Sequence, residues 1–355
     1  MTETFKEEVP SIMAAQPNPG HQPTPERIFS TVQAYHNAFV LKAGIELDVF
    51  TAIAKGNHTA AEIGRATKSA ERGTRILCDA LTVMGFLEKK GNRYSLSADS
   101  AFFFDKSSPA YMGDAFKFLM GLDQMENFVH LTESFRNGGR KTDHQSGPPE
   151  DTKWVDFARG MVPLMIPAAH AMARYLQPVL GSKASPKVLD IAAGHGIFGI
   201  TVAQHSPKAH IHAVDWANVL EVATENAQAH GVANRHHLIP GSAFDVEFGQ
   251  GYDAVLHTNF VHHFDVPTNE ALLKKLWKSM NPGAHLVILE FVPNDDRISP
   301  PAAAMFSVTM ISNTPAGDAY TFAEIAGMCA NAGFKDARVV PLEGSPEVLV
   351  VAQKP

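Results

Sequence analysis

Short apolar segments alternate with helical stretches in the second half of the chain, and this alternation limits the fold more than any other feature of the sequence. Beyond Lys187 the apolar segments have the length of β-strands, and the stretches between them have helical patterns. Such alternation is typical of an α/β sheet with helices on both faces. The expected strands are Val188–Ile191, Ile211–Val214, His237–Ile239, Ala254–His257, His285–Phe291 and Glu347–Ala352. We therefore predict an α/β domain over residues 181–355.

The first of these strands runs directly into a turn of small residues. The segment reads Asp190-Ile191-Ala192-Ala193-Gly194-His195-Gly196, and a helix is expected from about Ile197. Small side chains let the backbone approach a ligand closely, while a helix N-terminus offers unpaired N–H groups to an anionic group. Asp215 ends the next strand, where a carboxylate can accept hydrogen bonds from both ribose hydroxyls. The alanines in place of glycines argue against a dinucleotide, and a tight turn that binds no ligand is the other alternative.

The motif Asp190-x-Ala-Ala-Gly-His-Gly, followed by Asp215, resembles motifs I and II of class I S-adenosylmethionine-dependent methyltransferases. The resemblance implies a Rossmann-like domain, S-adenosyl-L-methionine as the cofactor, S-adenosyl-L-homocysteine as the product and no metal. In this family the loop cradles the methionine moiety, and the acid of motif II holds the ribose. The loop residues assigned in this way are Asp190, Ala192, Gly194 and Gly196.

The resemblance also places the adenine beside the segment that follows the third strand. The residues concerned are Ser242, Ala243 and Phe244. Many relatives have an acid in place of Ser242, and Asp245 is a candidate substitute. Trp216 either packs on the adenine face or is a half-buried core aromatic. Asn259, after the fourth strand, is also assigned to the cofactor.

A histidine-rich segment closes the fourth strand. It reads His257-Thr258-Asn259-Phe260-Val261-His262-His263-Phe264-Asp265. The carboxyl ends of strands in open α/β sheets face the ligand crevice, and a histidine there can accept a proton near neutral pH. Glu290 ends the fifth strand, where an acid can orient an imidazole and stabilise its charged form. A purely structural histidine is the alternative interpretation.

The chain also resembles, over nearly its whole length after residue 25, the plant-type O-methyltransferase family and its bacterial relatives such as hydroxyneurosporene methyltransferases. The first five positions of the family motif Leu-His-Asp-Trp-x-Asp align with Val261–Asp265, which implies that His262 is the general base and His263 a pocket residue. The first supporting Glu of the family falls on Glu290. A second would fall near Ala319, where no acid matches and Asp318 is adjacent.

The resemblance implies O-methylation of a small-molecule hydroxyl whose proton is removed by His262. The nearest alternative is S-, N- or C-methylation on the same scaffold, because such acceptors can react without a base. A non-methylating protein that binds S-adenosylmethionine is a further alternative, since a fold does not fix a function.

The N-terminal region has the pattern of a winged helix. Residues 1–24 are rich in proline and are expected to form a flexible arm. Helical periodicity predicts a helix over Pro25–Val49, broken near Gly44, and two more over Ala60–Ala66 and from an N-cap at Ser69 to Met84. A hairpin turning at Gly91-Asn92 follows.

By resemblance, residues 25–105 form a dimerisation domain, and the protein is a homodimer. A DNA-binding regulator is the alternative, because a winged helix can bind DNA. The segment Glu71–Met84 has no basic face, which disfavours that alternative.

Residues 106–180 are expected to link the two domains and to form the acceptor pocket. Helices are predicted over Met112–Asn137 and Trp154–Leu180, with a loop or lid at Gly138–Pro149. Apolar side chains on these helices can line a pocket, although simple core packing is the alternative. The residues assigned to the acceptor are Phe116, Met120, Phe128, Phe157 and Met161, together with His263.

Composition narrows the possible partners. The 30 Lys and Arg residues against 37 Asp and Glu give a formal charge of -7, which disfavours nucleic acid as the partner. No apolar stretch is long enough for membrane insertion, and no secretion signal is recognised. Cys78 and Cys329 form neither a disulfide framework nor a thiolate metal site. We therefore expect a cytoplasmic enzyme that acts on a small molecule.

Overall fold

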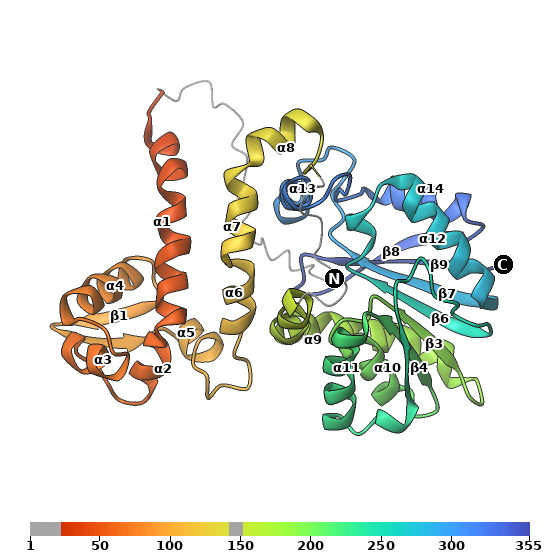
Figure 1. The fold of residues 1–355 in the computed structure, drawn as a ribbon, viewed down its shortest axis with the longest axis horizontal. Coiled ribbons are helices and arrows are strands. Elements are labelled where there is room, and N and C mark those ends of the chain that lie inside the picture. The colour runs from red at the N-terminus through yellow and green to blue at the C-terminus, as the bar shows by residue number, and fades with distance from the viewer. Residues whose placement is uncertain (1–22, 142–151) are drawn as a thin grey trace, which may run out of the picture.

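The computed structural model describes residues 23–141 and 152–355 of the chain (Figure 1). Most of the predicted N-terminal arm and most of the predicted loop at 138–149 lie outside these residues. The helices of the N-terminal and connecting regions are α1 (Glu26–Glu46), α2 (Val49–Ala54), α3 (Ala60–Ala66), α4 (Glu71–Val83), α5 (Ala98–Phe103), α6 (Gly113–Leu119), α7 (Leu122–Val129) and α8 (Leu131–Asn137), with the strands β1 (Leu87–Lys90) and β2 (Arg93–Leu96). The C-terminal helices are α9 (Thr152–Gly181), α10 (Ile197–His205), α11 (Ala217–Ala229), α12 (Val266–Ser279), α13 (Pro301–Asn313) and α14 (Phe322–Asn331). The C-terminal strands are β3 (Lys187–Ile191), β4 (His210–Asp215), β5 (His236–Pro240), β6 (Tyr252–Thr258), β7 (Met280–Glu290), β8 (Lys335–Pro341) and β9 (Val348–Gln353), and a short turn of 3-10 helix, η3, covers Val261–His263.

The N-terminal elements pack around a core of their own. Thr59 and Glu62 form a capping box that starts α3. The hairpin is antiparallel, with Leu87 opposite Leu96, and it turns where the Gly91-Asn92 pair predicted. Buried residues of this core include Ile45, Phe50, Ile63, Leu81 and Tyr94. The order of helices and hairpin is that of the predicted winged helix.

The break predicted near Gly44 is wrong. Helix α1 continues to Glu46, and the missing side chain at Gly44 leaves room for Leu81, whose Cδ1 lies 3.0 Å from the position that a Cβ would take. The chain turns instead at Asp48, whose φ is 56°.

Two further helix predictions need correction. Ala70, not Ser69, is the residue that precedes α4, and Ser69 instead donates its hydroxyl to the Thr67 carbonyl. The single helix predicted over Met112–Asn137 is divided into α6, α7 and α8. Gly121 has extended backbone angles, which separate α6 from α7.

The C-terminal sheet has the strand order β5-β4-β3-β6-β7-β9-β8. All its pairings are parallel except those of β9, which runs antiparallel to both β7 and β8. The sequence did not predict β8, which lies at the edge of the sheet and has a largely exposed residue pattern without clear alternation. The order of strands reverses between β3 and β6, so the crevice for a ligand is expected at the carboxyl ends of these strands.

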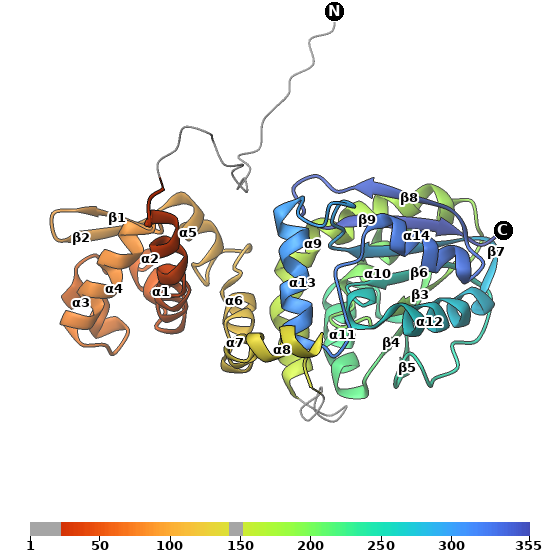
Figure 2. The same ribbon diagram turned by 90° about the horizontal axis from the view of Figure 1, so that it is seen from above.

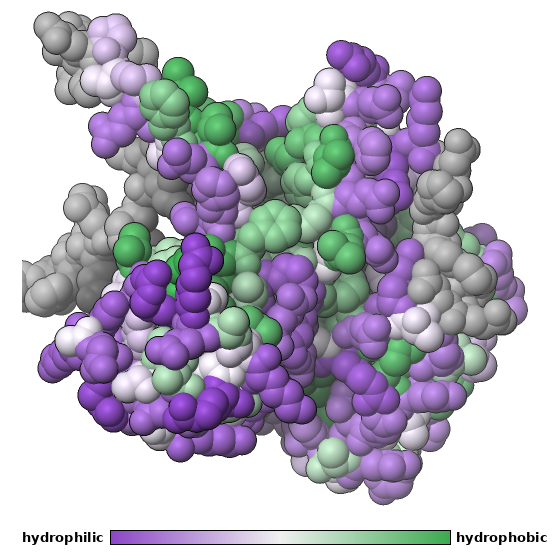
Figure 3. All heavy atoms as spheres, turned by 60° about the vertical axis from the view of Figure 1, so that its left-hand side comes forward, coloured by the Kyte–Doolittle hydropathy of each residue, from purple (hydrophilic) through white to green (hydrophobic). Residues whose placement is uncertain are grey.

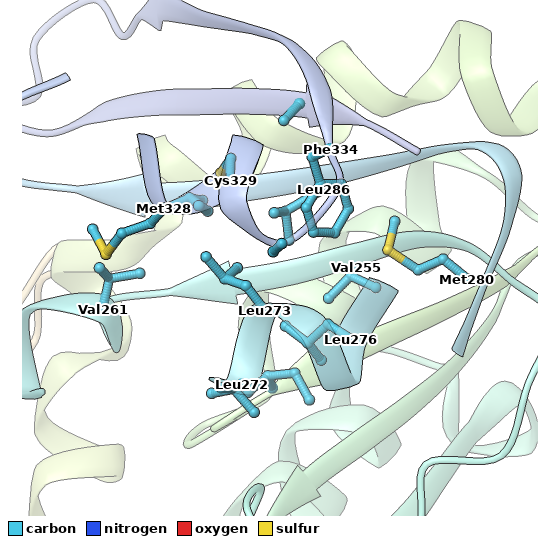
Figure 4. Packing of buried hydrophobic residues seen from close by; sticks show 14 of the residues in the cluster. Val255, Val261, Leu272, Leu273, Leu276, Met280, Leu286, Met328, Cys329 and Phe334 are labelled. Atoms are coloured by element: carbon cyan, nitrogen blue, oxygen red, sulfur yellow. The ribbon is translucent and has the colours of Figure 1, made fainter. Parts of the chain in front are cut away.

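Helices cover both faces of the sheet (Figures 1 and 2). On one face, α9 and α10 contribute Met172, Leu176, Phe198 and Ile200 to a buried cluster. On the other, α12 and α14 pack Leu272, Leu273, Leu276, Met328 and Cys329 against the strand residues Val255 and Leu286 (Figure 4). Helix α13 lies between α7–α8 and the sheet (Figure 2). Within the described ranges, no helix is both long enough and apolar enough to cross a membrane.

Candidate active site

The loop between β3 and α10 has a backbone that requires small residues. Ala192, Gly194 and Gly196 have φ angles of 50°, 56° and 73°, in the left-handed region. The Gly194 N–H donates to Asp215 Oδ2 at 2.8 Å, so the end of β4 fixes the loop. A side chain at Gly196 would lie 2.9 Å from the Ala223 Cβ, so this glycine also lets α10 pack closely on α11.

Asp190 is fully buried beneath this loop. Its Oδ2 accepts a hydrogen bond from the Gly199 N–H at 3.0 Å, whereas its Oδ1 has no partner among the described residues. Burial raises the pKa of Asp190 well above its usual range, and the charge of Asp215 acts in the same direction. A buried oxygen without a partner is a position where a donor group of a ligand could complete the hydrogen bonding.

Asp215 retains acceptor capacity after its backbone contacts. Its Oδ1 accepts from the Trp216 N–H at 2.7 Å, and each carboxylate oxygen has a second lone pair. Burial raises the pKa of Asp215 to about 6. Space is open over the loop, because a Cβ built on Gly194 would meet only the Ala192 carbonyl, at 3.9 Å. These features fit S-adenosylmethionine, whose ribose offers two hydroxyl donors.

The predicted adenine segment follows β5. The Ser242 Oγ accepts from the Phe244 N–H at 3.2 Å, and Ala243 is buried in the sheet core. The Phe244 ring lies 5.0 Å from the Phe264 ring and is partly exposed, so it presents an aromatic surface at this edge. Asp245 is exposed.

The other two predicted cofactor residues face the long helix α9. Trp216 is half-buried and packs in a cluster with Trp154 and Val219, as in the second of the two interpretations of this residue. Asn259 has a φ of 51°, and its side-chain Nδ2 donates to the Met165 Sδ at 3.5 Å.

His262 and Glu290 are in direct contact. Both side chains are buried, and the His262 Nδ1 lies 2.6 Å from the Glu290 Oε2. The other carboxylate oxygen, Oε1, accepts from the backbone N–H groups of Phe260 at 3.0 Å and His262 at 3.4 Å. A carboxylate beside Nδ1 favours the tautomer of the neutral imidazole that has its proton on Nδ1 and its lone pair on Nε2.

Two neighbouring histidines are kept neutral by burial. Both ring nitrogens of His257 have no partner among the described residues, and burial lowers its pKa to about 3. Burial and the nearby His262 lower the pKa of His263 as well. His262 differs from these two histidines because its Nδ1 contacts the carboxylate of Glu290. In residues 23–141 and 152–355, no group of three or more His, Cys, Asp or Glu side chains is arranged to hold a metal ion.

Helix α13 adds an aromatic wall that the sequence analysis missed. The Phe306 ring stands edge-on to His262 at 4.9 Å and stacks on Phe291 at 4.1 Å. A hydrogen bond of 2.6 Å from Asn127 to Asn313 connects this helix to α7. The Pro300-Pro301 pair was an available signal, because proline is favoured at the first position of a helix.

The residues predicted for the acceptor fall into two groups. Phe157 and Met161 lie on α9 four residues apart, and Met165 continues the same helix face toward Asn259. Phe157 also contacts the rings of Phe118 and Trp154, at 5.2 Å and 6.0 Å.

Apart from His263, the other residues predicted for the acceptor belong to α6, its C-cap and α7. Phe116 and Met120 pack against the N-terminal core, where the Phe116 ring lies 5.7 Å from Phe104. Phe128 lies on α7 with its side chain partly exposed.

The family's second Glu has no match at Ala319, and the adjacent Asp318 has a partner of its own. Asp318 is partly exposed and pairs with Arg297 at 3.3 Å, while Ala319 is fully buried. A different acid, Glu347, is buried close to Glu290, and the sequence analysis treated it only as the start of a strand.

Comparison with known proteins agrees with this geometry. Residues 171–335 match the family model of the O-methyltransferase domain, and residues 29–106 match that of the O-methyltransferase dimerisation domain. A putative O-methyltransferase from Nostoc punctiforme of known crystal structure is 45% identical, with a TM-score of 0.88, over 94% of this chain and 100% of that chain. The tetracenomycin polyketide synthesis 8-O-methyl transferase of Streptomyces glaucescens is 25% identical over 94% of this chain and 98% of its own. The 3-hydroxy-5-methyl-1-naphthoate 3-O-methyltransferase of Streptomyces sahachiroi is 27% identical over 84% of this chain and 86% of its own.

The strand order and the loop after β3 define the class of S-adenosylmethionine-dependent methyltransferases. The chain belongs to the family of O-methyltransferases that have an N-terminal dimerisation domain. The resemblance inferred from the sequence is thereby confirmed, together with the enzyme class, the cofactor and the winged-helix dimerisation domain.

Proposed function

We propose that this enzyme transfers a methyl group to a hydroxyl oxygen of a small aromatic acceptor, with His262 as the general base and Glu290 as its orienting partner. The contact of 2.6 Å between the His262 Nδ1 and the Glu290 Oε2 carries the proposal. Two backbone N–H groups hold the other oxygen of Glu290, so the carboxylate is fixed before any ligand binds.

The tautomer explains how His262 acts. When bound, S-adenosylmethionine supplies an electrophilic methyl group on a sulfonium centre. With its proton on Nδ1, His262 directs the lone pair of Nε2 to the acceptor hydroxyl and would take its proton as the C–O bond forms and the C–S bond to the methyl group breaks, with S-adenosyl-L-homocysteine as the leaving group. Glu290 then stabilises the positive charge on the imidazolium.

For the cofactor we propose a site formed by the loop from Asp190 to Gly196, by Asp215 and by the edge near Phe244. Support comes from the left-handed loop, the free acceptor capacity of Asp215 and the partnerless oxygen of Asp190. Asn259 borders this site from the end of β6.

An aromatic acceptor is supported by the surroundings of His262 and by the relatives. Phe306 stands against the imidazole, while Phe157 and Met161 lie on the helix face that leads to Asn259. Two relatives are named for O-methylation in polyketide synthesis and of a hydroxynaphthoate. Apolar and aromatic side chains of this kind suit a flat, weakly polar ligand.

The atom that receives the methyl group tests this function. The full chain would be incubated with S-adenosylmethionine labelled with ¹³C in the methyl group and with a panel of hydroxynaphthoates and phenols. We expect the label to appear as a methyl ether in the product. A label bonded to carbon, nitrogen or sulfur would reject O-methylation and favour the corresponding alternative.

We further propose that a second copy of the chain covers the exposed apolar face of α1. Ile28, Val32 and Phe39 are exposed along this helix, and Phe39 borders a depression of about 430 Å³ between α1 and α4. Hydrophobic side chains gather on this side of the molecule (Figure 3). The match of residues 29–106 to a dimerisation domain supports a second copy as the partner.

A further inference from the structure

Glu347 lies beside the pair formed by His262 and Glu290, although it is far from both in sequence. It directly precedes β9, whose first residue, Val348, is paired with Glu290 in the antiparallel register. The side chain of Glu347 is therefore brought to the carboxyl edge of the sheet, next to the end of β7. Only 4% of the residue is exposed.

The contacts of Glu347 leave its carboxyl group incompletely bonded. The Asn259 side chain hydrogen-bonds it and favours its charged form. The same Asn259 amide contacts Met165, so it connects Glu347 to the α9 face proposed for the acceptor. The Glu347 Oε1 is buried and has no hydrogen-bond partner among the described residues. An ionisable group buried in this way is costly for stability, which points to a role in function.

The charges around Glu347 come from a small set of groups. Glu290 on β7 is the ionisable group whose field acts on it, and burial together with this charge raises the pKa of Glu347 to about 7. From β6 and η3, His257 and His263 are held neutral by burial, and His262 is bonded to Glu290. Met165 on α9 is uncharged. Two carboxyl groups in one buried site compete for a single negative charge.

We propose that Glu347 is a positioning residue that sets the proton affinity of His262 through Glu290. When Glu347 is neutral, the single charge of Glu290 stabilises the imidazolium. When Glu347 is ionised, a second negative charge near the pair makes His262 a stronger base. This proposal rests on the proposed function, in which His262 is the base.

The titration of His262 tests this coupling without any acceptor. The full chain, labelled with ¹³C in its histidine rings, would be titrated by NMR, and the His262 signal would be assigned by its loss in His262→Gln. In the unaltered protein we expect a broad titration that reflects two coupled groups. In Glu347→Gln we expect a single ionisation, shifted to lower pH by about one unit.

Two further variants separate electrostatics from packing. Glu347→Asp keeps the charge and should keep the broad titration, whereas the exposed Glu343→Gln should leave the titration unchanged. An identical His262 titration in the unaltered protein and in Glu347→Gln would overturn the proposal. A failure of O-methylation with the acceptor panel would instead reject the proposed function and leave this titration as an independent result.

Discussion

The two parts of the chain differ in what they bury. In the C-terminal sheet, every residue of β6 is buried, and the core is completed within one chain. In the N-terminal part, Ile28 and Val32 of α1 are 65% and 62% exposed. An exposed apolar face of this kind is typical of a surface that a partner covers.

The two parts also differ in their charged groups. Arg75 and Asp79 on α4 form an ion pair on the surface, which contributes little to stability. At the carboxyl edge of the sheet, by contrast, His262, Glu290 and Glu347 are buried within one site. The contrast teaches that the C-terminal part has the features of catalysis and the N-terminal part those of assembly. Substitutions in each part test this division.

Replacing the proposed base should have the largest effect. His262→Ala removes the group that accepts the hydroxyl proton, so we expect turnover to fall by about two to four powers of ten. Binding of S-adenosylmethionine, measured by calorimetry, should barely change. The matched control is His230→Ala, an exposed histidine at the end of α11, which should have normal turnover. Near-normal turnover in His262→Ala at saturating acceptor would reject the base.

Neutralising Glu347 should change how stability depends on pH. The pKa of Glu347 is raised from 4.5 to about 7, so its stabilising contribution is present below pH 4.5 and is lost as the pH rises through 7. The full loss corresponds to about 3 kcal/mol. Urea unfolding of Glu347→Gln should therefore show a gain over the unaltered protein that grows between pH 5 and pH 8. Glu343→Gln is the control, and a gain that is equal at both pH values would contradict the raised pKa.

Removing the proposed ribose acceptor should weaken the cofactor. Asp215→Ala takes away the charged acceptor at the end of β4 and also frees the Gly194 N–H. We expect binding of S-adenosylmethionine to weaken by about 1.5–3 kcal/mol. Calorimetry on Asp215→Ala, with the exposed Asp99→Ala in the N-terminal part as the control, provides the measurement. Unchanged affinity in Asp215→Ala would place the ribose elsewhere.

A charge on the exposed face of α1 should weaken the dimer, and this is the smallest of the expected effects. Phe39 is 45% exposed within one chain, so the loss of the apolar contact that this exposed part makes in the dimer should cost about 1 kcal/mol per copy in Phe39→Glu. Light scattering over a dilution series measures the shift toward monomer. Gln33→Glu adds the same charge at an exposed polar position of α1 and is the control. Equal dimerisation of both variants would move the interface away from this face.

Local patterns were sufficient to predict much of the site. The strand ends placed His262 and Glu290 correctly at one edge, because the carboxyl ends of neighbouring parallel strands meet there. Glu347 could not be found in this way. Its position depends on the insertion of β9 between β7 and β8, a non-local pairing that reverses the direction of one strand. Phe306 was missed for a related reason, since its helix packs on the site from outside the sheet.

The tautomer of His262 tests the central claim most directly. Nitrogen-15 NMR of the histidine rings, at a pH where His262 is neutral, distinguishes a protonated from an unprotonated ring nitrogen. Because Glu290 accepts at Nδ1, we predict a proton on Nδ1 and an unprotonated Nε2 in the full chain. In Glu290→Gln this preference should weaken. A proton on Nε2 in the unaltered protein would contradict the claim, because the lone pair of His262 would then lie on Nδ1, facing Glu290, and Nε2 could not accept a proton from the acceptor.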